Sequence, residues 1–174
     1  MWWSRAFALA CILLLGACGF RPLYGTSQYG AGTSPELESI NVGTVLSRAS
    51  PRTAQLLRND LLDRLTPDGP PRNLRYTLSA AMVEAFQDVV VNQQSEVTRR
   101  ELLLQVSYQL YDARNNQLVH QGTARAASSY DVLRADFGNV AAERDVRQRL
   151  ARELAEQMRG ELATWFARGV APAH

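Results

Sequence analysis

Two stretches of alternating apolar and polar residues most limit the folds that this chain can adopt. In residues 101–111 the side chains of one parity are leucine, valine and tyrosine, and those of the other parity include Gln105, Ser107 and Gln109. Residues 74–92 begin with the same period of two. Successive side chains of a strand point to opposite faces, so each stretch predicts a strand with one buried face and one polar face. Such strands are typical of an antiparallel sheet covered on one face only.

A first helix is predicted over residues 51–65. It starts at Ser50-Pro51, where the serine oxygen can cap free N–H groups and proline suits the first helical position. Leucines then recur at three- and four-residue spacing. The proline- and glycine-rich run 66–71 ends the helix.

A second helix is predicted near the C-terminus. Asn139 is its expected N-cap, and the acids that follow suit the first turns of a helix. An apolar stripe runs from Val146 to Trp165 at helical spacing, and Arg168-Gly169 closes the helix.

Two further strands complete the predicted sheet. Residues 37–46 are a short candidate, and residues 117–130 return after a turn at 112–116, where asparagine tolerates positive φ. The pattern of residues 117–130 is too weak to set their register. The order strand-helix-strand-strand-strand-helix predicts an α+β fold, with two helices packed on one face of a four-stranded, mostly antiparallel sheet.

The N-terminus predicts lipid attachment. Residues 1–17 have the features of a secretory leader, and their apolar stretch is shorter than the roughly 20 residues that a transmembrane helix needs. The leader ends in Leu15-Gly16-Ala17-Cys18, which resembles a bacterial lipobox. In a lipobox the peptidase cuts before a cysteine whose thiol has received a diacylglycerol. Cys18 is therefore expected to become the acylated first residue of the mature protein and to anchor it in a membrane.

The remaining chain divides into three predicted parts. Residues 18–35 form the lipidated N-terminus and a tether, residues 36–169 a single domain, and residues 170–174 a frayed C-terminus. An aspartate directly after the acylated cysteine tends to retain such lipoproteins at the inner membrane, but here that position is Gly19. We therefore expect an outer-membrane location.

Composition argues against nucleic-acid binding and against catalysis. All 19 basic residues are arginine, and 17 acids leave a net charge of only +2, whereas nucleic-acid binders carry a large basic excess. Both cysteines lie within the first 18 residues, so the predicted domain has no thiolate. His120 is expected to be an ordinary strand residue, either polar on the surface or partly buried, and His174 lies at the end of the chain. No catalytic residue, cofactor or metal is expected.

The start of the predicted mature chain carries a family resemblance. Its sequence Cys18-Gly19-Phe20-Arg21-Pro22-Leu23-Tyr24-Gly25 resembles the opening of the LptE family, the lipopolysaccharide-assembly lipoproteins of Gram-negative bacteria. The predicted element order agrees, and residues 142–145 resemble alphaproteobacterial members. The resemblance implies a non-enzymatic subunit in the lumen of the LptD outer-membrane β-barrel. It would help the barrel fold and assist delivery of lipopolysaccharide to the outer leaflet.

This resemblance suggests two sets of contact residues. Arginine binds phosphate through two parallel hydrogen bonds, and lipid A carries phosphates. Arg99 and Arg100, in a predicted loop between strands, and Arg125 and Arg134, near another sheet end, are candidate lipopolysaccharide contacts, with solvated surface as the alternative. The second set could contact the barrel or form a local packing clasp: Phe20, Pro22, Leu23 and Tyr24.

Two other functions remain open at this point. A periplasmic accessory lipoprotein of a lipid-transport ABC system would have a similar lipobox and size, and it would bind inner-membrane subunits. A lipid-anchored hydrolase is disfavoured because the predicted domain has no nucleophile–base pair.

Overall fold

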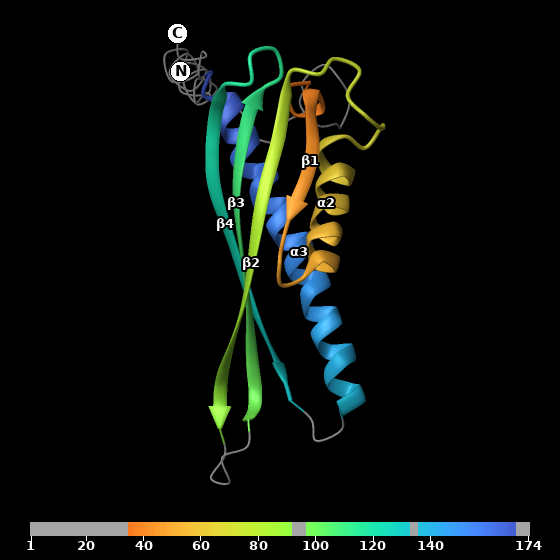
Figure 1. Ribbon diagram of the computed structural model, residues 1–174, viewed down its shortest axis with the longest axis vertical. Helices are drawn as coiled ribbons and strands as arrows, with labels where there is room; N and C mark the ends of the chain where they lie inside the picture. The colour runs from red at the N-terminus through yellow and green to blue at the C-terminus, as the bar shows by residue number, and fades with distance from the viewer. Residues whose placement is uncertain (1–34, 92–96, 133–135, 170–174) are drawn as a thin grey trace, which may run out of the picture. The chain divides into compact units, whose positions relative to one another are not determined.

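The computed structural model describes residues 35–91, 97–132 and 136–169 (Figure 1). The predicted α+β class and the predicted order of strands and helices are confirmed. The elements are a 3-10 turn η1 (Leu37–Ser39), β1 (Ile40–Leu46), α2 (Pro51–Leu65), β2 (Tyr76–Val91), β3 (Val97–Asp112), β4 (Leu118–Asp131) and α3 (Asp136–Ala167).

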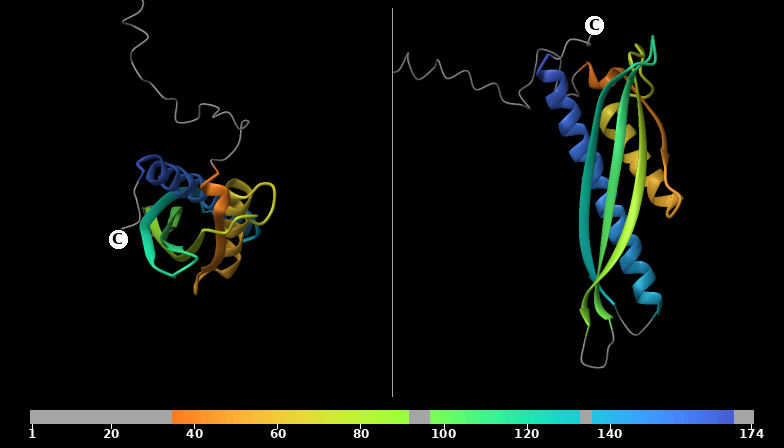
Figure 2. Two further views of the ribbon diagram at one scale, coloured as in Figure 1. Left: turned by 90° about the horizontal axis from the view of Figure 1, so that it is seen from above. Right: turned by 60° about the vertical axis from the view of Figure 1, so that its left-hand side comes forward.

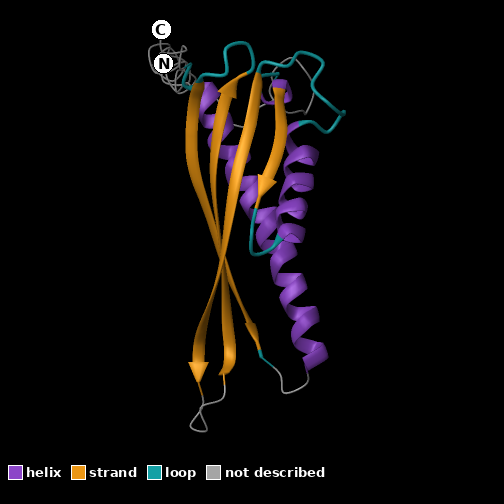
Figure 3. Cartoon of the chain, in the orientation of Figure 1, coloured by secondary structure: helices purple, strands orange, loops and turns teal. Residues whose placement is uncertain are grey.

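The four strands form one sheet in the order β1-β2-β3-β4. β1 is parallel to β2, and the other two pairs are antiparallel. Pairing with β1 ends at Ala81, so β2 and β3 continue with β4 as a three-stranded sheet. We call this part, residues 82–91 of β2 and their partners, the distal half. Both helices cover one face of the sheet (Figures 2 and 3), and we call the other face the open face.

The core lies between the sheet and the two helices. In β3 the predicted apolar parity is confirmed, because Leu102, Leu104, Val106, Tyr108 and Leu110 are each at most 1% exposed. The predicted stripe of α3 is also buried from Val146 to Leu162. At about 25 cal/mol per Å² of apolar area removed from water, this contact is the main source of stability.

Several predicted element boundaries were wrong. Residues 37–39 form a 3-10 turn instead of a strand, because the Ser39 N–H and hydroxyl both donate to the carbonyl oxygen of Glu36. Leu74 lies before β2 and is exposed. α3 starts at Asp136, so Asn139 lies inside the helix. Glycine costs a helix only about 1 kcal/mol, and Gly138 therefore does not force a later start.

The signals at the β3–β4 turn, at both ends of α2 and at the end of α3 were accurate, but the Ser50 hydroxyl hydrogen-bonds with the Thr53 hydroxyl and caps no backbone N–H. α2 begins and ends as predicted, and α3 ends just before Gly169, which has a φ of 59°. Asn116 in the β3–β4 turn has a φ of 55°. The register of β4, which the pattern left open, pairs His120 with Leu110, with one irregularity next to it. Within the described ranges, neither helix combines the length and apolarity needed to cross a membrane.

Gly122 makes room for a large buried side chain. It pairs with Tyr108 across β3 and β4, and an added Cβ would lie 2.4 Å from the tyrosine hydroxyl oxygen. That hydroxyl donates a hydrogen bond to Glu161 of α3, which limits how far the ring can move. The glycine therefore leaves the space in which the Tyr108 side chain reaches from β3 past β4 to α3.

Two glycine-to-alanine substitutions should change stability in opposite directions. Gly122→Ala should lower the free energy of unfolding by about 1–3 kcal/mol, because the methyl group overpacks against Tyr108. Gly160→Ala is the matched control, since its Cβ would meet nothing within 4 Å and alanine favours a helix by about 1 kcal/mol. Chemical denaturation followed by circular dichroism measures both. Stabilisation by both substitutions would contradict the packing role of Gly122.

Candidate functional site

Several predicted site residues lie outside the described residues. These are Cys18 and the candidate barrel contacts Phe20, Pro22, Leu23 and Tyr24, together with the candidate lipopolysaccharide contact Arg134. The leader and the C-terminal residues 170–174 are also outside. The site can therefore be built only from the folded domain.

Arg99 and Arg100 lie in a strand, and their prediction as loop residues was wrong. β3 begins at Val97, because β2 and β3 keep pairing beyond the alternating stretch of the sequence. Arg99 contacts Asp131 at 2.9 Å, and Arg100 contacts Asp88 at 2.8 Å. The hydrogen bond to Asp88 raises the pKa of the Arg100 guanidinium, against a smaller opposing effect of burial. Any phosphate bound here must therefore compete with an aspartate.

Arg125 lies in the middle of β4, and its predicted place near a sheet end was also wrong. It pairs with Gln105 of β3 and is exposed on the open face. Among the described residues it has no ion-pair partner. Of the candidate arginines that the structure describes, it is the one whose guanidinium is available to a new anion.

An ion-pair cluster that sequence reasoning missed joins the distal half to α3. Arg147 of α3 contacts Glu84 of β2 at 2.7 Å and also pairs with Glu143. The guanidinium carbon of Arg147 lies 5.7 Å from the ring centre of Phe86. Burial lowers the pKa of Arg147, but the hydrogen bonds and charges of Glu84 and Glu143 more than offset it, so the net shift is upward. The sequence does contain a signal for this cluster, because Glu84 occupies the next position in the row of alternate apolar residues of β2.

A small pocket lies between β4 and the C-terminal half of α3. It has a volume of about 560 Å³ and includes His120, Glu161 and Trp165. The His120 ring stacks on Trp165 with 5.2 Å between ring centres. Burial lowers the pKa of His120, against the opposing charge of Glu161, and so favours the neutral ring. As predicted, His120 is a partly buried strand residue.

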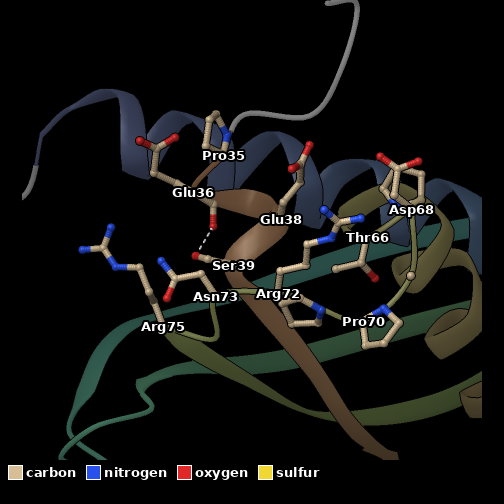
Figure 4. Close-up of a pocket in the computed structure, with 13 residues that line it drawn as sticks. Pro35, Glu36, Glu38, Ser39, Thr66, Asp68, Pro70, Arg72, Asn73 and Arg75 are labelled. Atoms are coloured by element: carbon tan, nitrogen blue, oxygen red, sulfur yellow. Dashed lines mark hydrogen bonds between the residues drawn. The ribbon is translucent and has the colours of Figure 1, made fainter. Parts of the chain in front are cut away.

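A second pocket lies where the described chain begins, between η1 and the loop that follows α2 (Figure 4). Its volume is about 740 Å³. Glu36, Glu38 and Asp68 line it together with Arg72 and Arg75, so its charges are mixed. Across the described ranges, no three His, Cys, Asp or Glu side chains are grouped to hold a metal ion.

Comparison with known proteins identifies the family. The sequence matches the family model "LptE: Lipopolysaccharide-assembly" over residues 37–161, which is most of the chain. The chain belongs to the LptE family. The match covers all of the sheet and both helices except the last residues of α3. Among curated proteins, no sequence matches the chain.

Several solved structures of bacterial lipoproteins are similar to this chain. A candidate lipoprotein from Caulobacter crescentus CB15 is 29% identical, with a TM-score of 0.59 over 75% of this chain and 92% of that chain. Rare lipoprotein B from Shewanella oneidensis is 10% identical, with a TM-score of 0.55 over 74% and 98%. A minor lipoprotein from Acinetobacter baumannii is 19% identical, with a TM-score of 0.51 over 72% and 90%. The last two comparisons show a shared fold.

Removing the Glu84 carboxylate should destabilise the domain more than removing an exposed one. The Glu84 side chain is only 4% exposed, and hydrogen bonds to a charged group contribute about 1.5–3 kcal/mol, so Glu84→Gln should cost about 2 kcal/mol. The control is Asp88→Asn, whose pair with Arg100 is solvent-exposed and should cost less than about 1 kcal/mol. Chemical denaturation measures both. Equal losses would show that the Glu84 pair is no more than a surface contact.

Proposed function

We propose that this LptE-family chain is a lipid-anchored subunit of an LptD-type outer-membrane β-barrel and assists lipopolysaccharide delivery to the outer leaflet. The family match over residues 37–161 carries the proposal. In this role acyl chains on Cys18 hold the protein in the inner leaflet of the outer membrane. Phe20, Pro22, Leu23 and Tyr24 then lie close to the anchor, where they can contact the barrel.

The dimensions of the folded domain support a position inside a barrel. α3 has 32 residues and therefore a length of about 48 Å at 1.5 Å per residue. β2 and β3 have 16 residues each, or about 50 Å. The apolar band of an outer-membrane barrel is about 25 Å tall. Elements of this length can extend through the lumen and still reach the periplasm.

Co-purification from native membranes tests this function. The tagged full-length protein, extracted in mild detergent, should bring down one heat-modifiable β-barrel of the LptD type in about equal amount. The intact mass of the same sample should show a chain that begins at acylated Cys18. Recovery of ABC-transporter subunits, or of no partner, would overturn the barrel assignment and favour the accessory-lipoprotein alternative.

Charge reversal tests the proposed lipopolysaccharide contacts at Arg99 and Arg100. The double variant Arg99→Glu/Arg100→Glu should bind lipopolysaccharide about tenfold more weakly or worse, because charge-assisted hydrogen bonds to phosphate are lost. Arg125→Glu tests the third described candidate in the same way. Binding is measured by displacement of a labelled polymyxin, and circular dichroism checks the fold.

A control separates the loss of phosphate contacts from the loss of ion pairs. Asp88→Asn/Asp131→Asn breaks the same two ion pairs but leaves both arginines in place. This variant should bind lipopolysaccharide at least as tightly as the wild-type protein, because the guanidinium groups no longer have an aspartate partner. Equal binding by both double variants would remove Arg99 and Arg100 from the site.

A further inference from the structure

Three stretches of strand edge in this sheet pair with no other described strand. They are the outer edge of β1, the edge of β2 beyond Ala81, and the outer edge of β4. At such an edge every second residue directs its N–H and C=O away from the sheet, so the edge can accept a further strand. Natural proteins hinder this pairing with bulges, inward-pointing charges or covering groups. An edge without such protection is therefore a candidate binding surface.

Two of the three edges are protected. In β1 the carbonyl oxygens of Val42 and Gly43 accept hydrogen bonds from the guanidinium of Arg58, and the pairing with β2 is irregular after Val42. In the distal half of β2, Glu84 is an inward-pointing charge, and the register shifts after Asp88. Both edges therefore carry features that hinder a further strand.

The edge of β4 has no such feature over residues 120–124, all of which the structure describes. Pairing with β3 is regular from His120 to Asp131, and the stretch 120–124 contains no proline, acid or arginine. Five residues of a strand span about 17 Å. This open edge therefore has room for a short extended segment.

The pocket between β4 and α3 lies along this open edge, and we call it the β4–α3 groove. β4 and the C-terminal half of α3 lie side by side there (Figure 2). Residues 120–122 line one side, and α3 contributes a stripe at three- and four-residue spacing from Gln157 to Arg168. At 1.5 Å per residue this stripe is about 17 Å long, which matches the open edge. A strand paired with β4 would direct every second side chain into the groove.

The side chains of the groove suit one apolar and one acidic side chain of a ligand. The His120 ring stacks on Trp165, which also packs against two further aromatic rings and is held in place by them. Of the two charged side chains in the groove, Glu161 accepts a hydrogen bond from the Tyr108 hydroxyl. Arg168, at one end, has no ion-pair partner among the described residues and is exposed.

An extended polypeptide fits these features better than a second copy of the chain. The outward main-chain groups of an edge repeat about every 6.8 Å, and only another strand has the same repeat. Such strand addition gains affinity from main-chain hydrogen bonds and specificity from pockets for alternate side chains. If β4 paired with β4 of a second copy around Gly122, His120 and Ala124 would enter the groove, and neither supplies a carboxylate to Arg168.

We infer that residues 120–124 of β4 bind an extended segment of another protein as a fifth strand, with an apolar side chain beside Trp165 and a carboxylate at Arg168. These two side chains of the partner lie an even number of positions apart, because both face the groove. The inference goes beyond the proposed function and does not depend on it.

A peptide selection on the full-length tagged protein in detergent tests the inference. A phage library of random ten-residue peptides is the probe, and enriched peptides are synthesised with a fluorescent label for anisotropy measurements. They should contain an apolar and an acidic residue an even number of positions apart. N-methylation of alternate peptide nitrogens should weaken binding at least tenfold, because those N–H groups pair with β4. Methylation of the intervening nitrogens should change binding less than threefold.

Two matched pairs of variants locate the binding site. Gly160→Trp fills the groove, since an added side chain at Gly160 meets nothing within 4 Å, and Gln148→Trp adds the same side chain to an exposed position of α3 outside the groove. Arg168→Glu reverses the charge in the groove, and Arg152→Glu does so outside it. The two groove variants should bind the enriched peptides at least tenfold more weakly. The two controls should stay within twofold of the wild-type protein.

Three results would overturn the inference. They are an N-methylation scan without alternation, a selection that enriches no peptide sensitive to Gly160→Trp, and a dimer in light scattering that Gly160→Trp converts to a monomer. The last result would assign the edge to a second copy of the chain. For a variant that circular dichroism shows to be unfolded, the N-methylation scan on the wild-type protein decides. None of these results bears on co-purification of the barrel, so the proposed function stands or fails separately.

Discussion

The packing of one apolar sheet face against α3 is the contact on which the rest of the structure depends. A strand of β3's length has no stability of its own in water, and a helix gains most of its stability from tertiary packing. The leucines of β3 and the stripe of α3 supply that packing for each other. Because the two helices cover one face only, the open face remains exposed.

Elements with strong local signals could be predicted from the sequence. α2 agrees with its prediction at both ends, because Ser50-Pro51 and the run 66–71 act within a few residues of the boundary. Which side chains of β3 are buried was also predictable. Its apolar residues occupy alternate positions, and a shift of one residue would move all of them from the core to the solvent. The first turn of α3 was missed because Gly138 and Asn139 resemble the residues that precede a helix. In the structure both residues lie inside the helix.

The candidate site was less predictable because its geometry depends on register. The sequence places Arg99 and Asp131 32 residues apart, and only the pairing of β3 with β4 brings them into contact. The same holds for Glu84 and Arg147, 63 residues apart. The sequence does show that Glu84 occupies a position expected to be apolar in the alternation of β2. It does not show that Arg147 is its partner. Which residues share the open face likewise emerges only once the strands are aligned.

The distal half shows how ion pairs supplement a thinner core. Beyond Ala81 the sheet loses β1, and the core becomes thinner, so that Phe86 is 46% exposed although it points toward the helix side. There Arg147, which pairs with Glu84 and lies over the Phe86 ring, adds to the apolar contact between sheet and helix. On the open face the ion pair of Arg99 and Asp131 joins β3 to β4 near the same end. Arg125, farther along the open face, has no such partner among the described residues, so its guanidinium is available to an anion.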